Sequence, residues 1–183
     1  MTAPVIHMNG WPGCGKRTIA RTLAARIGGR VLDNHVILDA ATAVFDRGTP
    51  GAAALRERVR SVLYDAILDL PPGVPIVLTD ALSDDDGALV RPSVALAARR
   101  GAPFRPFVLD LDLEENLRRL TDPPRRGGGK LVDPDILVTI RSDERLLTLP
   151  GAIRLDVTRL SALDASRAIE AALANQGSAK DGG

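Results

Sequence analysis

Residues 10–18 read GWPGCGKRT, and this stretch decides how the rest of the sequence is interpreted. It nearly matches the phosphate-binding loop pattern G-x-x-x-x-G-K-[ST], but Arg17 stands where the pattern has a hydroxyl residue, which follows only at Thr18. In such a loop, glycines let consecutive backbone N–H groups turn toward phosphate oxygens, and the next helix directs its positive end at the same anion. The lysine, here Lys16, then reaches the outer phosphates, and the hydroxyl binds Mg²⁺.

The sequence on either side of the loop supplies the strand and the helix that a phosphate-binding loop requires. The apolar residues 5–8 predict a strand that leads into the loop. Ile19, Leu23 and Ile27 then recur every four residues, which indicates a helix, and a pair of glycines ends it. A glycine-rich turn without a ligand is the alternative interpretation, and the agreement of motif and context argues against it.

Composition limits the class of protein. The 183 residues suit one domain; 45% are hydrophobic and 26% are charged, as expected for a packed globular protein. A net charge of +1 gives no reason to expect binding to nucleic acid or to a membrane. A single cysteine and two histidines exclude an internal disulfide and argue against a zinc site. The first residues lack the pattern of a signal peptide, so we expect a cytoplasmic location.

Apolar runs alternate with helical patterns along the chain, which predicts an α/β domain with a parallel sheet. A single domain is expected over residues 1–175, followed by a disordered polar tail over residues 176–183. The predicted strands are residues 5–8, 30–33, 74–79, 104–111 and 152–157. The predicted helices are residues 16–27, 35–45, 54–70, 92–100, a segment capped by Asp112, 134–147 and 161–174.

The loop resembles the adenylate-kinase-like form, G-x-P-G-x-G-K-G-T, which also has one residue between the lysine and the threonine. Pro12 stands at that family's proline, whereas Arg17 replaces its glycine, so the Arg17 side chain is expected to point to solvent or toward phosphate. The resemblance implies that Thr18 is the hydroxyl for Mg²⁺. It also implies that ATP is bound by the loop residues Gly10, Pro12, Gly13, Cys14, Gly15, Lys16, Arg17 and Thr18.

The short chain, the order of its elements and the absence of a guanine-reading N-K-x-D motif resemble the nucleoside-monophosphate and shikimate kinase group. This resemblance implies the P-loop NTPase fold, with three layers (α/β/α) and a five-stranded parallel sheet in the order 2-3-1-4-5. It also implies a lid at about residues 121–146, ATP and Mg²⁺ as cofactors, and transfer of the γ-phosphoryl group to a hydroxyl or phosphate of a small molecule. Nucleotide and acceptor are the expected partners, and the acceptor is not identified.

Two carboxylates stand at predicted strand ends, where open α/β sheets bind ligands. Asp33 matches the carboxylate that faces the acceptor in shikimate kinases and in relatives similar to chloramphenicol phosphotransferase, which implies a catalytic base, with Asn34 and His35 beside the same acceptor. The alternative is that Asp33 only caps the next helix. Asp80 ends the apolar run before it and is expected to hold Mg²⁺ through water or to contact the acceptor; a plain strand-ending carboxylate is the alternative.

Phosphoryl transfer needs cations, and the predicted lid supplies several. Arg118 or Arg119 matches the arginine that opens the lid in the related kinases, and these two are candidates for nucleotide binding. Arg125 and Arg126 are candidate catalytic residues, with Lys130 beside them; a solvated basic loop is the alternative.

A second group of arginines, at positions 56, 58 and 60, lies in the segment where related kinases bind the acceptor. Arg56 is the candidate for holding an acidic group there, and a solvated helix face is the alternative.

Other functions remain open at this point. A nucleotide-binding regulatory protein with little transfer activity would carry the same loop, and a protein that binds only a stray anion would show no affinity for nucleotide. A further alternative makes Cys14 a nucleophile, with His35 as its base.

Overall fold

The computed structural model describes residues 2–122 and 131–178. The strands are β1 (Val5–Gly10), β2 (Arg30–Asp33), β3 (Ile76–Asp80), β4 (Phe104–Asp110) and β5 (Ile153–Asp156). The helices are α1 (Lys16–Ile27), α2 (Asn34–Thr42), α3 (Pro50–Leu68), α4 (Arg91–Arg99), α5 (Leu113–Leu120), α6 (Pro134–Asp143) and α7 (Ala162–Ser178), with a short 3-10 turn η1 (Asp84–Asp86).

The five strands form one sheet in the order β2-β3-β1-β4-β5, and every neighbouring pair is parallel. This confirms the predicted fold class and strand order. β1 lies in the centre and all six of its residues are buried. Because parallel strands need crossover connections, the carboxyl ends of all five strands meet at one edge, where the loops to the helices begin.

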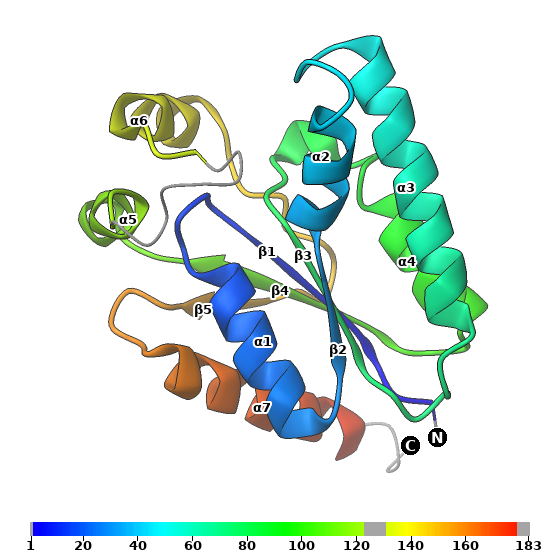
Figure 1. Ribbon diagram of the computed structural model, residues 1–183. Coiled ribbons are helices and arrows are strands. Elements are labelled where there is room, and N and C mark those ends of the chain that lie inside the picture. Colours follow the sequence, from blue (N-terminus) through cyan, green and yellow to red (C-terminus); the bar gives the residue numbers. More distant parts are fainter. Residues whose placement is uncertain (1, 123–130, 179–183) are drawn as a thin grey trace.

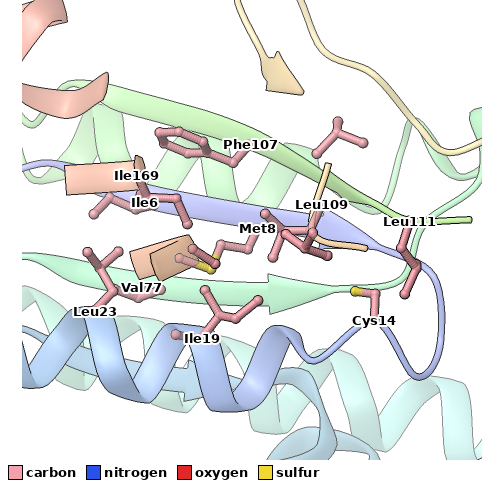
Figure 2. Packing of buried hydrophobic residues seen from close by; sticks show 14 of the residues in the cluster. Ile6, Met8, Cys14, Ile19, Leu23, Val77, Phe107, Leu109, Leu111 and Ile169 are labelled. Atoms are coloured by element: carbon pink, nitrogen blue, oxygen red, sulfur yellow. The ribbon is translucent and has the colours of Figure 1, made fainter. Parts of the chain in front are cut away.

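Alternating side chains of the central strands build two separate cores, one on each face of the sheet. On one face, Ile6, Met8 and Val77 pack with α1 and α7, and Figure 2 shows this cluster reaching Cys14 and Leu111 near the phosphate-binding loop. On the other face a second cluster packs against α3 and α4. Figure 1 shows the resulting three layers, with α1 and α7 on one side of the sheet and α3 and α4 on the other.

Three helices differ most from the sequence-based boundaries, and one of them, α6, ends at Asp143 instead of at residue 147. The predicted helix over 54–70 begins earlier, at Pro50, because the Thr49 hydroxyl accepts a hydrogen bond from the Ala52 N–H, and proline is tolerated in a first turn, where its missing N–H costs nothing. α7 extends to Ser178, so its last residues include the first part of the predicted tail. The other elements lie within a few residues of their predicted positions.

The segment that follows α6 is attached to the loop after β3. Ser83 and Leu146 form an isolated antiparallel bridge. The buried Asn9 side chain, at the end of β1, joins the same segments, because its amide donates to Leu82 O at 2.9 Å and to Leu147 O at 3.0 Å. The end of the predicted lid is therefore held at the carboxyl edge of the sheet. In the described part of the chain, no helix is both long and apolar enough to cross a membrane.

Candidate functional site

The loop of residues 10–18 connects β1 to α1, as a phosphate-binding loop must. Gly13 and Gly15 have φ of 91° and 95°, a region that other residues rarely adopt, and these angles turn the loop around the start of α1. Gly10 must also be glycine, because a Cβ there would lie 2.5 Å from the carbonyl oxygen of Leu109. The glycines thus form a cradle of backbone at the N-terminus of a helix, and this arrangement suits a phosphate chain.

Lys16 lies folded over this loop. Its Nζ donates to Gly10 O at 2.6 Å and to Trp11 O at 2.8 Å. A phosphate group would replace these neutral carbonyls by a charged acceptor, which binds an ammonium group about twice as strongly. Thr18 is exposed on the first turn of α1, whereas Cys14 is fully buried. The burial of its thiol argues against Cys14 as a nucleophile.

Residues on α5 and α6 hold the loop from outside; we call Asn116, Arg119 and Arg141 the loop brace. The Asn116 amide donates to Pro12 O at 2.8 Å and its oxygen accepts from Arg141 at 2.9 Å. The Arg141 guanidinium also lies over the Trp11 ring, 5.2 Å from its centre. Trp11 therefore wedges the loop beneath Arg141, and it is buried rather than presented to an acceptor.

Of the two arginines that end α5, only Arg119 reaches the loop. It donates to Cys14 O at 3.2 Å and to the carbonyls of Val157 and Thr158 after β5 at 2.9 and 3.0 Å. Glu115 aligns it through a 2.6 Å ion pair. Hydrogen bonds from Arg118 and from Arg119 lower the pKa of Glu115 to about 2.

The remaining candidate cations of the predicted lid divide into two groups. The Arg118 side chain is 67% exposed and pairs with Glu115 on the outer side of α5. Arg125, Arg126 and Lys130 lie outside the described residues.

Arg17 faces Asp33 instead of solvent or phosphate, the two directions expected from the sequence. Its Nε lies 3.2 Å from Asp33 Oδ2; the Arg17 side chain is 42% exposed and the Asp33 side chain only 8%. Neither of these two atoms makes a hydrogen bond. The contact is therefore an ion pair between the first turn of α1 and the end of β2.

Asp33 also caps α2, as the alternative interpretation proposed. Its Oδ1 accepts from the His35 backbone N–H and from the Thr79 hydroxyl, both at 3.1 Å. One oxygen of the carboxylate is thus occupied by the fold, whereas the other faces a cation. Capping and a chemical role are compatible here, because they use different oxygens.

Asp80 lies on the opposite face of the sheet from Asp33 and its Thr79 partner. Side chains alternate along β3, so Thr79 follows Val77 toward α1, whereas Asp80 follows Leu78 toward α3 and α4. There Asp80 Oδ2 lies 2.9 Å from Nε2 of the fully buried His7.

A small pocket, with a volume of about 10 Å³ and so room for about one water molecule, lies between β2, β3, α2 and α3. Its polar lining includes Asn34, Arg60, Tyr64, Thr79 and Asp80. The three arginines of α3 separate clearly: the one at position 58 is exposed, Arg56 is half-buried, and Arg60 is buried. Of the candidate acceptor residues, Asn34 lines this pocket, whereas Arg56 and His35 are half-buried and are not among its lining residues.

Several residues of this region were not identified from the sequence. Asn116, His7, Thr79 and Tyr64 belong to no motif, and their positions depend on which strands and helices become neighbours. Among the described residues, no three His, Cys, Asp or Glu side chains gather as a metal site.

Comparisons with known proteins agree with this architecture. No protein-family model and no curated protein matches the chain. A proposed kinase from Chloroflexus aurantiacus matches with a TM-score of 0.64 and 17% identity, over 96% of this chain and 98% of the other. The APS kinase of Mycobacterium tuberculosis, in complex with AMPPNP and APS, gives 0.59 and 16%, over 94% and 98%. The shikimate kinase of Acinetobacter baumannii, in complex with shikimate, gives 0.56 and 20%, over 95% of both chains.

These similarities extend over nearly the whole length of both chains in each pair. The identities are low, so the similarity concerns the fold. The five-stranded sheet order, the loop between β1 and α1, and the three-layer arrangement agree with that result. The chain has the fold of the small-molecule P-loop kinases.

Proposed function

We propose that this protein is an ATP-dependent phosphotransferase that moves the γ-phosphoryl group of ATP to a small-molecule acceptor. One observation carries the proposal: a phosphate-binding loop and a pocket lined by polar side chains open at the same edge of one sheet, with Asp33 between them. Kinases of this fold have been seen with AMPPNP and APS, and with shikimate, which supports the same pairing of a nucleotide and a small acceptor.

In this proposal the loop residues 10–18 bind the phosphates through their backbone N–H groups. Lys16 leaves the carbonyls of Gly10 and Trp11 and contacts the outer phosphates. The cradle fits phosphate, because its glycines leave room for a close approach of the backbone. Thr18 is the candidate ligand of Mg²⁺, which when bound neutralises phosphate charge. Arg119 keeps the loop in shape from outside.

The acceptor lies at the carboxyl edge of the sheet, beside Asn34, His35 and Arg56. Asp33 accepts the proton of the attacking hydroxyl through its Oδ2 oxygen, and Oδ1 stays bonded to Thr79 and to α2. Asp80, oriented by His7, is a second carboxylate at the pocket wall and contacts the acceptor. Arg125 and Arg126 remain proposed contributors of positive charge, as does Arg118 at the entrance to the lid.

The Arg17–Asp33 ion pair favours a second candidate, a nucleotide-binding regulatory protein with little transfer. In this ion pair the Arg17 guanidinium occupies Asp33 Oδ2, the oxygen that would have to accept the proton of an attacking hydroxyl. In this alternative, nucleotide binds at the same loop, but no acceptor increases turnover.

The two candidates are separated by measuring ADP release from ATP·Mg²⁺ with a panel of hydroxylated metabolites, nucleotides and antibiotics. The kinase proposal expects one class of acceptor to stimulate release, and expects Lys16→Ala to abolish the stimulation. Arg99→Gln, which removes an exposed cation at the end of α4, serves as the matched control and should retain it. Measurable ATP binding with equally slow release for every compound would favour the regulatory protein.

A further inference from the structure

Two cations stand together at the start of α1, next to the phosphate-binding loop. Lys16 is the first residue of the helix and Arg17 the second, and the first turn contains no acidic residue. The N-terminus of a helix carries a partial positive charge, so acidic groups are stabilising there and cations are not. Two adjacent cations at this end therefore need anionic or polar partners from outside the helix.

Arg17 has such a partner in Asp33, at the end of β2. Nε of the arginine lies 3.2 Å from Oδ2 of the carboxylate. Neither of these buried atoms makes a hydrogen bond, so the ion pair lacks the aligned N–H···O bond that makes such pairs strong. A weak pair of this kind can be exchanged for a better one at little cost in free energy.

Asp33 is the fixed member of the pair. Its side chain is only 8% exposed, and its Oδ1 accepts from the Thr79 hydroxyl and from the His35 backbone N–H, both at 3.1 Å. The Arg17 side chain, by contrast, is 42% exposed and extends from the first turn of a helix. A change in the pair therefore moves the guanidinium and leaves the carboxylate in place.

Phosphate oxygens are the stronger partner for this guanidinium. A guanidinium binds phosphate through parallel, charge-assisted N–H···O bonds, a geometry that the contact with Asp33 lacks. Because Arg17 directly follows Lys16, a phosphate chain in the loop lies at the same end of α1 as the Arg17 side chain. The adenylate-kinase-like loop has glycine at this position, which offers no side chain to either partner.

We propose, resting on the proposed function, that Arg17 is a positioning residue that exchanges Asp33 for phosphate when nucleotide binds. Without nucleotide, the guanidinium covers Oδ2, the oxygen that accepts the proton of the attacking hydroxyl. With nucleotide in the loop, the guanidinium binds phosphate oxygens and leaves Oδ2 open to that hydroxyl. Asp33 is therefore available as a base only after nucleotide has bound, which sets the order in which the two substrates are used.

The first test measures the affinity of the full chain for AMPPNP·Mg²⁺ by isothermal titration, in the wild type, Arg17→Gln, Asp33→Asn and the double variant. Asparagine keeps an Oδ1 for Thr79 and for the cap of α2, so Asp33→Asn removes the charge and retains those contacts. Two exposed residues provide matched controls: Arg21→Gln, one turn further along α1, and Asp39→Asn on α2.

We expect Asp33→Asn to tighten AMPPNP binding about fivefold, because the nucleotide no longer has to break the ion pair. Arg17→Gln alone should weaken binding about tenfold, and Asp33→Asn in that background should change affinity less than about twofold. Each control should also change affinity less than about twofold. An equal gain from Asp33→Asn in both backgrounds would mean that the carboxylate only repels phosphate through space, and would overturn the inference.

Side-chain NMR of the arginine Nε–Hε groups then reports where Arg17 lies, and its signal is identified by its loss in Arg17→Gln. Without nucleotide, Asp33→Asn should move this signal, because it removes the charged partner. With saturating AMPPNP·Mg²⁺, the wild type and Asp33→Asn should give the same Arg17 signal. A signal that Asp33→Asn moves equally in both conditions would show that Arg17 stays on Asp33, and the inference would be rejected.

The inference and the proposed function fail in different ways. Exchange of Arg17 by both measurements, without any acceptor that stimulates ADP release, would reject phosphoryl transfer and retain the exchange. Transfer to an acceptor by a protein in which Arg17 stays on Asp33 would reject the exchange and retain the proposed function. No binding of AMPPNP to the wild type would reject both.

Discussion

Arg17 Nε lies 3.2 Å from Asp33 Oδ2 and joins the residue after the loop lysine to the end of β2. The contact links the proposed nucleotide site to the proposed acceptor site through two adjacent charges. Arg17 is half-exposed, so its remaining N–H groups are open to a ligand, whereas Asp33 is buried. A phosphate that arrives at the loop would therefore compete with Asp33 for the same guanidinium.

Arg17→Gln and Asp33→Asn should show coupled effects on the free energy of unfolding. Removing either charge leaves its partner unpaired, whereas removing both leaves neither, so a double-mutant cycle should give an interaction energy of about 1 kcal/mol. Urea unfolding of the wild type, both single variants and the double variant measures it. Strictly additive effects would mean that the two side chains do not interact in solution.

The loop brace should control nucleotide affinity from outside the site. Asn116→Ala removes the hydrogen bonds to Pro12 O and to Arg141, and leaves buried polar groups unpaired, at a cost of about 1–3 kcal/mol. If about 1.4 kcal/mol of this free energy must be supplied to order the loop when ATP binds, the Kd for ATP rises tenfold. Titration of a fluorescent ATP analogue measures the change, with Arg99→Gln on the exposed face of α4 as the control. An unchanged Kd in a folded Asn116→Ala variant would reject the role of the brace.

Gly13→Ala should be more damaging than Gly101→Ala, although both glycines have positive φ, 91° and 59°. At either position, alanine in the left-handed backbone conformation lowers the free energy of unfolding by about 1–2 kcal/mol. At Gly13 the new Cβ would also lie 2.8 Å from the Asn116 side chain, whereas nothing lies within 4 Å at Gly101. Thermal unfolding and ATP titration should show a lower Tm and weaker binding for Gly13→Ala. Equal effects of the two variants would argue against tight packing of the loop on α5.

Stability should fall in acid partly through Glu115, whose pKa the two arginine hydrogen bonds lower from 4.5 to about 2. A group with a lowered folded-state pKa stabilises the fold above its unfolded pKa, and this contribution is lost as pH falls from about 4.5 toward 2. Glu115→Gln should therefore be less stable than the wild type at pH 6, with a difference that shrinks below pH 4.5. Urea unfolding across this pH range measures the difference; one that is independent of pH would contradict the prediction.

The sequence predicted those parts of the fold that depend on local signals. α1 ends where predicted because Gly28 follows it as a left-handed cap. The short strand β2 also has its predicted boundaries. The helix predicted over residues 54–70 begins earlier, at Pro50, because Thr49 provides a cap that the sequence pattern did not identify. Local patterns predict which segments are helical better than they predict the first residue of each helix.

Contacts between distant segments could not be predicted in the same way. The Arg17 side chain finds Asp33 only because β2 lies at the edge of the sheet beyond β3, next to the start of α1. The choice of Arg119 over Arg118 depends on the rotation of α5 about its axis, which a pair of adjacent arginines does not reveal. Asn116 carries no motif, and its role requires two helices and the loop to meet.

The most direct test follows the γ-phosphorus of ATP by ³¹P NMR in the presence of Mg²⁺ and the acceptor that stimulates ADP release most strongly. A new signal from the phosphorylated acceptor should grow as the ATP signals decline, with ADP formed in equal amount, and no such signal should form with Lys16→Ala. Appearance of inorganic phosphate alone, at the same rate with and without the acceptor, would contradict the claim that this protein transfers the phosphoryl group to a small molecule.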